Sequence, residues 1–169
     1  SRYTPDRRDL NRTFPGNKNG SLTARLAHLI MKEVVGRCDY IIDLHTAAVR
    51  RTNFPNVRAD MDDPDCERLA EVFGAEVIVN SSGPDGSLRR EACRAGCPTI
   101  ILEAGEALKV EPSVQDMTQR GLTHIMAELD MIDVTDDLRP DTPPHQMIVQ
   151  GSSWVRAGSG GFLKFHVAP

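Results

Sequence analysis

The feature that most constrains the fold is a set of three short apolar runs, separated by stretches with helical periodicity. The runs cover residues 39–45, 75–79 and 99–103. Short continuous runs of this kind are typical of strands that are buried on both faces of a parallel sheet. Parallel strands need crossover connections, and these are usually helices. The sequence therefore predicts an α/β fold with a mostly parallel sheet.

Helices are predicted between these runs, over residues 21–35, 63–74, 87–95 and 112–131. Ser21, Asp63 and Ser87 are suitable N-caps, because their side-chain oxygens can accept from free backbone N–H groups. Residues 1–20 and 46–62 lack periodicity and are predicted to be loops. In the first helix, one face carries the apolar side chains Leu22, Leu26, Leu29, Ile30 and Val34.

The chain is expected to divide into a main domain and a tail. Residues 1–132 carry the α/β pattern. Residues 133–146 contain acidic residues and three prolines and are expected to form a linker. Residues 147–169 contain short strand candidates and resemble the beginning of a β-rich module.

The composition excludes several classes of protein. The 169 residues carry a formal net charge of −4, which gives no reason to expect a nucleic acid or an anionic membrane as partner. No apolar run approaches the roughly 20 residues of a membrane helix. The four cysteines form no CxxC pair, so we expect reduced thiols in a cytoplasmic protein. Whether the protein forms a homo-oligomer is left open.

His45 lies at the carboxyl end of the first predicted strand, where ligands bind in open α/β sheets. A single histidine at such a position is more often a structural hydrogen-bonding residue than a metal ligand, because zinc sites use at least three protein ligands. Asp43 lies two residues earlier and shares the same face of the strand, so its carboxylate could orient the imidazole.

Glu103 is expected at the end of the third strand. Burial of a carboxylate is costly, so a glutamate there is paired, protonated or used in chemistry, for example as a general base that acts on water. The alternative interpretation is a glutamate that leaves the strand and is solvated. The residues alone leave both interpretations open.

Arginine and asparagine side chains of two segments could bind a carboxylate. Arg2, Asn11 and Arg12 belong to the first loop, and a guanidinium pairs with a planar carboxylate through two hydrogen bonds. Arg89 lies at the start of a predicted helix, where a cation opposes the helix dipole and a structural reason for it is poor. Ordinary solvated arginines remain the alternative interpretation for the loop.

Three segments in order along the chain resemble the succinylglutamate desuccinylase/aspartoacylase family. They are residues 9–16 (DLNRTFPG), 43–47 (DLHTA) and 96–105 (GCPTIILEAG). Members of this family are zinc hydrolases, so the resemblance implies a three-layer, carboxypeptidase-like fold with a mixed sheet. It also implies Zn²⁺ as cofactor and an N-acyl amino acid as substrate.

The resemblance also implies a role for each candidate residue. His45 matches the third zinc ligand, and Glu103 matches the glutamate that activates the zinc-bound water. Arg2 matches the arginine that polarises the scissile carbonyl, although Arg7 and Arg8 are alternatives. The substrate-binding positions are matched by Asn11, Arg12 and Arg89.

The sequence departs from the family pattern in one respect. The family binds zinc with a His-x-x-Glu pair upstream of the third ligand, and the sequence contains no such pair before His45. We therefore expect a fold that is incomplete at both ends, remaining zinc ligands upstream, and an inactive chain when it is isolated. A carboxypeptidase-type peptidase and a non-catalytic carboxylate-binding domain are the alternative functions.

Overall fold

A computed structural model describes residues 2–133, 145–151, 153 and 155–161. The elements in chain order are η1 (Leu10–Arg12), α1 (Leu22–Glu33), η2 (Val35–Arg37), β1 (Ile41–His45), β2 (Thr52–Ala59), α2 (Pro64–Phe73), β3 (Val77–Asn80), α3 (Leu88–Arg94), β4 (Thr99–Glu106), α4 (Pro112–Glu128) and β5 (Met147–Val149).

The five strands form one mixed sheet in the order β1-β4-β2-β3-β5. The pairs β1–β4, β2–β3 and β3–β5 are parallel, and β2–β4 is antiparallel. This confirms the predicted α/β class with a mostly parallel sheet. Each of the four predicted helices is present, and the side chains of Ser21, Asp63 and Ser87 accept hydrogen bonds from the first turns as expected.

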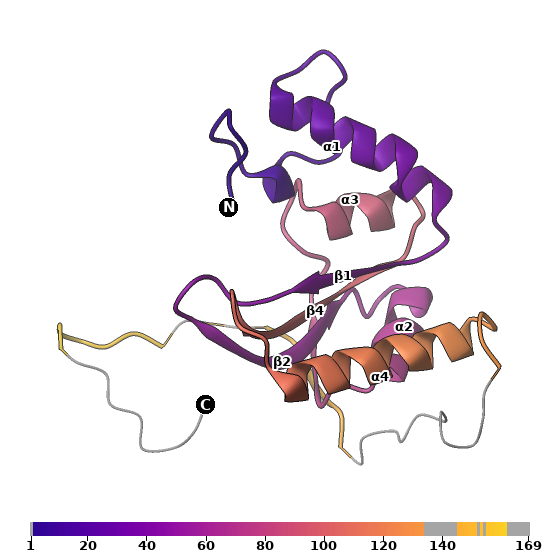
Figure 1. Cartoon of the computed structure of the whole chain (residues 1–169), viewed down its shortest axis with the longest axis vertical. Coiled ribbons are helices and arrows are strands. Elements are labelled where there is room, and N and C mark those ends of the chain that lie inside the picture. Colours follow the sequence, from indigo (N-terminus) through magenta and orange to yellow (C-terminus); the bar gives the residue numbers. More distant parts are fainter. Residues whose placement is uncertain (1, 134–144, 152, 154, 162–169) are drawn as a thin grey trace.

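Helices cover both faces of the sheet. α1 and α3 lie on one side, and α2 and α4 lie on the other (Figure 1). The larger apolar core is between the sheet and the α2–α4 layer, and the smaller one joins η2, α3 and the segment before β4. The large core side chains with little or no exposure include Val57, Leu69, Phe73, Ile78, Ile100 and Ile125. Ile41, which packs against the smaller core, shares its face of β1 with the polar residues Asp43 and His45.

The prediction of a loop over residues 46–62 was wrong, because β2 occupies Thr52–Ala59 at the centre of the sheet. Pro55 and two asparagines within the strand hide its pattern, since proline is normally confined to edge strands and bulges. The third predicted strand was also too short. β4 continues past Glu103 to Glu106, so Glu103 lies within the strand and not at its end.

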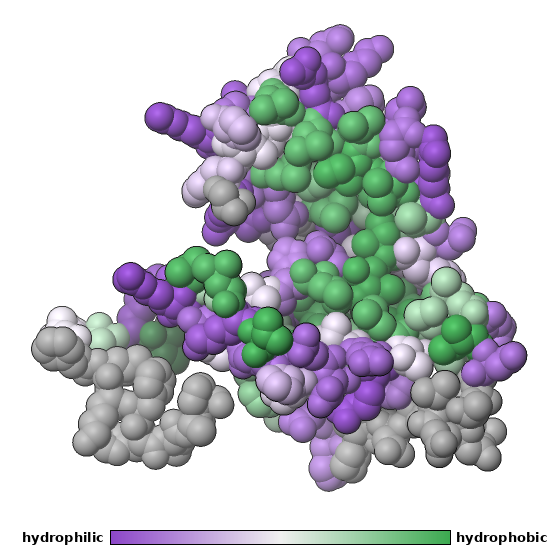
Figure 2. Space-filling view, in the orientation of Figure 1, coloured by the Kyte–Doolittle hydropathy of each residue, from purple (hydrophilic) through white to green (hydrophobic). Residues whose placement is uncertain are grey.

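The apolar face predicted for α1 is largely exposed. Leu22, Leu26 and Leu29 are 46%, 37% and 54% exposed, whereas the residues that α1 buries are Thr23 and Ala27. Figure 2 shows apolar surface gathered over this part of the molecule. The helix was therefore predicted correctly from its periodicity. Its apolar face, however, is not the face of α1 that packs against the rest of the chain.

The first residues of the tail belong to the sheet. β5 pairs with β3, and Met147 N–H donates to Glu76 O at 2.8 Å. Residues 134–144 of the expected linker, and Trp154 and residues 162–169 of the expected β module, lie outside the described residues. The boundary at 146 stays a prediction. None of the helices in the described residues combines the length and the hydrophobicity of a membrane span.

Candidate active site

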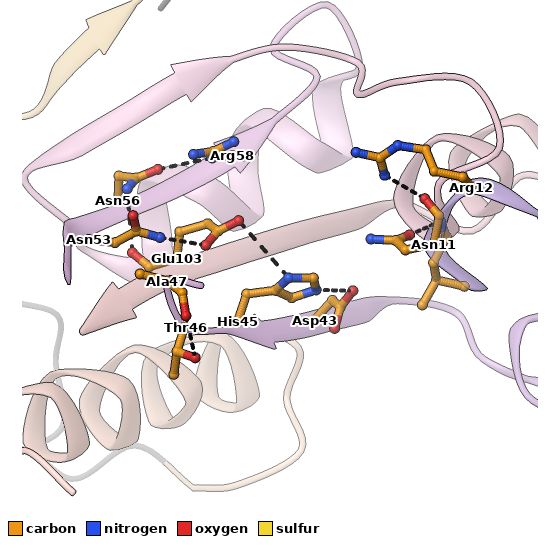
Figure 3. A network of polar contacts seen from close by, with 11 residues as sticks. Asn11, Arg12, Asp43, His45, Thr46, Ala47, Asn53, Asn56, Arg58 and Glu103 are labelled. Carbon is orange, nitrogen blue, oxygen red and sulfur yellow. Dashed lines mark hydrogen bonds and ion pairs between the residues drawn. The ribbon is translucent and has the colours of Figure 1, made fainter. Parts of the chain in front are cut away.

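His45 and Glu103 lie opposite each other on adjacent strands. The parallel register pairs His45 of β1 with Glu103 of β4, so their side chains project from the same face of the sheet. The Nδ1 atom of His45 is 4.0 Å from Oε1 of Glu103. Both side chains are mostly buried, with exposed fractions of 30% and 16%. An imidazole and a carboxylate that are far apart in sequence therefore meet on the α1–α3 side of the sheet (Figure 3).

Asp43 holds the His45 ring by its other nitrogen. The Asp43 Oδ2 atom lies 2.8 Å from His45 Nε2, which is the contact predicted from their spacing in the strand. A carboxylate can only accept here, so Nε2 carries the hydrogen and Nδ1 of the neutral ring has a free lone pair. The hydrogen bond to Asp43 raises the pKa of His45, and burial opposes this effect. The lone pair of Nδ1 is thereby directed toward the Glu103 side.

β2 adds a group of polar residues that the sequence analysis did not select. Asn53 Nδ2 donates to Glu103 Oε2 at 2.7 Å, and Asn56 Nδ2 lies 3.4 Å from the Glu103 backbone oxygen. Arg58 Nε donates to Asn56 Oδ1 at 3.3 Å. Residues 57–59 alternate between buried apolar and polar side chains, with Arg58 between Val57 and Ala59. This pattern is typical of a strand and could have identified β2 in the sequence.

The first loop brings Asn11 and Arg12 to the same side of the sheet. Asp9 accepts from Asn11 N–H at 3.0 Å and caps η1. Asn11 Oδ1 accepts from Leu88 N–H at 2.8 Å, so the loop is fixed to the start of α3. In Figure 3 the Asn11 amide and the Arg12 guanidinium extend toward the region of His45 and Glu103. The roles expected for Asn11 and Arg12 stay predictions.

Arg2 and Arg89 are not brought into contact with this group. The Arg2 Nε atom pairs with Asp9 Oδ2 at 2.8 Å, and the Arg2 side chain is 63% exposed. Arg89 is 3% exposed and donates through Nη1 to the Ser81 backbone oxygen. Burial lowers the pKa of Arg89, and its Nε has no hydrogen-bond partner among the described residues. Their expected roles stay predictions.

One residue of the site, His45, could serve as a metal ligand. His45, with Nε2 tied to a carboxylate and Nδ1 open, has the arrangement that metal-ligating histidines adopt. Within the part of the chain that the structure describes, no group of three His, Cys, Asp or Glu residues could hold a metal ion together. His45 is therefore the residue of this group whose geometry fits a metal ligand.

Comparison with known proteins identifies the family. Residues 1–129 match the succinylglutamate desuccinylase/aspartoacylase catalytic domain. The chain is 25% identical over 168 residues to the N-alpha-acetyl-L-2,4-diaminobutyric acid deacetylase of Halomonas elongata, covering 95% of this chain and 49% of that protein.

Solved structures have the same fold. The crystal structure of succinylglutamate desuccinylase/aspartoacylase from Rhodobacter sphaeroides superposes with a TM-score of 0.74 at 25% identity, over 90% of this chain and 48% of that chain. The product-bound ectoine utilization protein EutE (DoeB) of Ruegeria pomeroyi superposes with a TM-score of 0.72 at 19% identity, over 89% and 46%. The chain spans about half the length of these relatives. It belongs to the succinylglutamate desuccinylase/aspartoacylase family of catalytic domains.

Proposed function

We propose that the protein containing this chain hydrolyses the amide bond of an N-acyl amino acid or a related small carboxylate. The observation that carries the proposal is the pairing of His45 with Glu103 across β1 and β4, with Nδ1 and Oε1 directed toward each other. Family membership supports a hydrolase, and the relative from Halomonas elongata is a deacetylase of an N-acetylated amino acid. The complete protein is expected to have a three-layer, carboxypeptidase-like fold.

Zinc is the metal we propose for this site. His45 would bind it through Nδ1, because Nε2 is already tied to Asp43, and the remaining ligands would come from polypeptide outside residues 1–169. Bound zinc supplies a Lewis acid and lowers the pKa of a bound water to near neutrality.

Glu103 is the proposed general base. It would accept the proton of the attacking water on Oε1 and pass it to the nitrogen of the leaving amine. Its position supports this role, because the carboxylate is largely buried and one oxygen is held by Asn53 while the other faces His45. Because water itself would attack the carbonyl carbon and the C–N bond would break as the amine is protonated, the reaction needs no covalent intermediate with the enzyme.

The arginines and Asn11 are proposed to bind the charged parts of the substrate. Asn11 and Arg12 extend from η1 toward the site (Figure 3) and would hold the substrate carboxylate. Arg89 is proposed as a further substrate residue. Arg2 would stabilise the developing oxyanion. For Arg2 this role requires its guanidinium to turn away from Asp9.

The test is a substrate panel for the complete enzyme. N-acetyl and N-succinyl amino acids are compared with short unmodified peptides, each with zinc and with a chelator. Hydrolysis of N-acyl amino acids that is lost in chelator supports the proposal. Preference for peptides indicates a carboxypeptidase-type peptidase instead. Carboxylate binding that persists in chelator, without any hydrolysis, indicates a non-catalytic binding domain.

A further inference from the structure

A β-bulge in β2 turns an additional side chain toward Glu103. In the antiparallel pair with β4, Asn53 lies opposite Gly105 and Asn56 lies opposite Glu103. Three steps along β2 therefore match two steps along β4, which is the mark of a bulge with one extra residue. The bulge includes Phe54-Pro55, and proline is tolerated there because it needs to donate no ladder hydrogen bond.

The bulge decides which side chains share a face. In a regular strand, residues 53 and 56 would project from opposite faces. Here both lie opposite β4 residues of the Glu103 face, since Glu103 and Gly105 are two residues apart. Asn53 and Asn56 consequently both reach the polar side of the sheet, where His45 and Glu103 lie (Figure 3).

Asn53 and Asn56 contact different parts of Glu103. Asn53 Nδ2 donates to the carboxylate oxygen Oε2 at 2.7 Å. Asn56 Nδ2 donates to the Phe54 backbone oxygen at 2.8 Å and lies 3.4 Å from the Glu103 backbone oxygen. The two asparagines can therefore be compared by mutation, because only Asn53 donates to the Glu103 carboxylate.

The hydrogen bond from Asn53 occupies Oε2 of Glu103 and leaves the other carboxylate oxygen, Oε1, free to accept a proton. Among the described residues, the contact of Oε1 is with His45 Nδ1 at 4.0 Å. Without a donor on Oε2, the carboxylate could rotate about its terminal bond, which has a broad torsional preference. The Asn53 amide removes that freedom and keeps the free lone pairs of Oε1 on the His45 side.

We propose that Asn53 is a positioning residue that fixes the Glu103 carboxylate for proton transfer. This inference rests on the proposed function, because it assigns Asn53 to the orientation of the general base. A purely structural role is a poor explanation, since β2 and β4 are already joined by ladder pairing on both sides of the bulge.

The test compares variants at Asn53 and Asn56 in the complete, zinc-loaded enzyme with an N-acyl amino acid as substrate. Asn53→Ala should lower kcat by about 10- to 100-fold, the size of one hydrogen bond to a charged group, with KM, zinc content and urea midpoint near those of the parent. Asn56→Ala is the matched comparison. Its amide contacts backbone oxygens and not the Glu103 carboxylate, so this variant should lose less kcat than Asn53→Ala.

Asn53→Leu separates positioning from packing. Leucine has nearly the size and branching of asparagine but has no polar group, so it fills the space and cannot donate to Glu103. A positioning role predicts a kcat for Asn53→Leu as low as that of Asn53→Ala, whereas a packing role predicts a kcat near that of the parent. In a Glu103→Gln background, Asn53→Ala should cause no further loss.

The outcomes for the two proposals differ. An active parent whose Asn53→Ala variant keeps full kcat, or loses kcat only together with a fall in the urea midpoint, overturns the role of Asn53 and leaves the hydrolase proposal intact. A zinc-loaded parent that hydrolyses no N-acyl amino acid overturns both.

Discussion

The His45 imidazole lies between two carboxylates, with Nε2 at 2.8 Å from Asp43 Oδ2 and Nδ1 at 4.0 Å from Glu103 Oε1. The parallel register of β1 and β4 produces this arrangement directly, because it places residues 45 and 103 side by side. One carboxylate orients the ring, and the other faces its open nitrogen. The site therefore depends on strand register as much as on the identity of its residues.

Removal of the Asp43 carboxylate should weaken metal binding. Asp43→Ala frees the His45 ring to rotate and to change tautomer, and loss of such a partner typically lowers metal affinity by about 10- to 100-fold. Competition with a chromogenic chelator measures the zinc affinity of the complete enzyme. Asp39→Ala removes an exposed carboxylate just before β1 and should leave the affinity unchanged. Equal affinities of the Asp43→Ala variant and the parent would show that Asp43 does not orient the ligand.

The isolated chain should bind zinc weakly. Residues 1–169 contribute His45 to the proposed site, and tight zinc sites use at least three protein ligands. Elemental analysis after dialysis should find far less than one zinc per chain, whereas the complete enzyme should retain about one. Stoichiometric zinc in the dialysed chain would show that it contains ligands other than those proposed.

Asp6 should make stability depend on pH. Hydrogen bonds from the Thr23 and Thr4 side chains and from Thr23 N–H hold the pKa of Asp6 well below its ordinary value. A depressed pKa in the folded state stabilises the protein above the pKa of the unfolded chain, and this contribution is lost as pH falls through the folded value. Asp6→Asn should therefore lower the urea midpoint at pH 7, and the difference should shrink below about pH 4.

Asp62→Asn is the control for this experiment, because Asp62 is exposed and its carboxylate makes no hydrogen bond that the structure shows among the described residues. A difference between the Asp6→Asn variant and the parent that is constant from pH 7 to pH 3 would contradict the linkage.

Gly121 should be required for the packing of α4 on α2. A Cβ at this position would lie 2.5 Å from the ring atoms Cε1 and Cζ of Phe73. Alanine gains about 1 kcal/mol of helix propensity over glycine, but overpacking a buried contact typically costs about 1–3 kcal/mol. Gly121→Ala should therefore lower the free energy of unfolding in urea, whereas Gln119→Ala on the exposed side of α4 should not. A more stable Gly121→Ala variant would show that Phe73 can move aside.

The sequence predicted the elements that follow simple rules. The apolar runs gave β1, β3 and the first half of β4, and the caps Ser21, Asp63 and Ser87 marked the helix starts. β2 was missed because its strand pattern is broken by Pro55 and by polar side chains that belong to the site. Because β2 was not predicted, Asn53 was not selected as a candidate site residue.

Other features depend on contacts with distant parts of the chain and could not be predicted from short sequence patterns. Periodicity identified α1 but could not show that Leu22, Leu26 and Leu29 stay exposed, because that depends on what packs against the helix. Arg89 was selected for its position at a helix start, yet its burial follows from contacts with the 81–87 loop. The pairing of His45 with Glu103 could be anticipated, because both residues lie at the carboxyl side of parallel strands.

The most direct measurement is the activity of Glu103→Gln in the complete, zinc-loaded enzyme. The substitution keeps the size of the side chain but removes the base, so kcat for an N-acyl amino acid should fall by about 10²- to 10⁴-fold. Zinc content should stay at the parent value, because His45 remains bonded to Asp43. Unchanged turnover in the Glu103→Gln variant would contradict the proposed pairing of His45 and Glu103 as the catalytic centre.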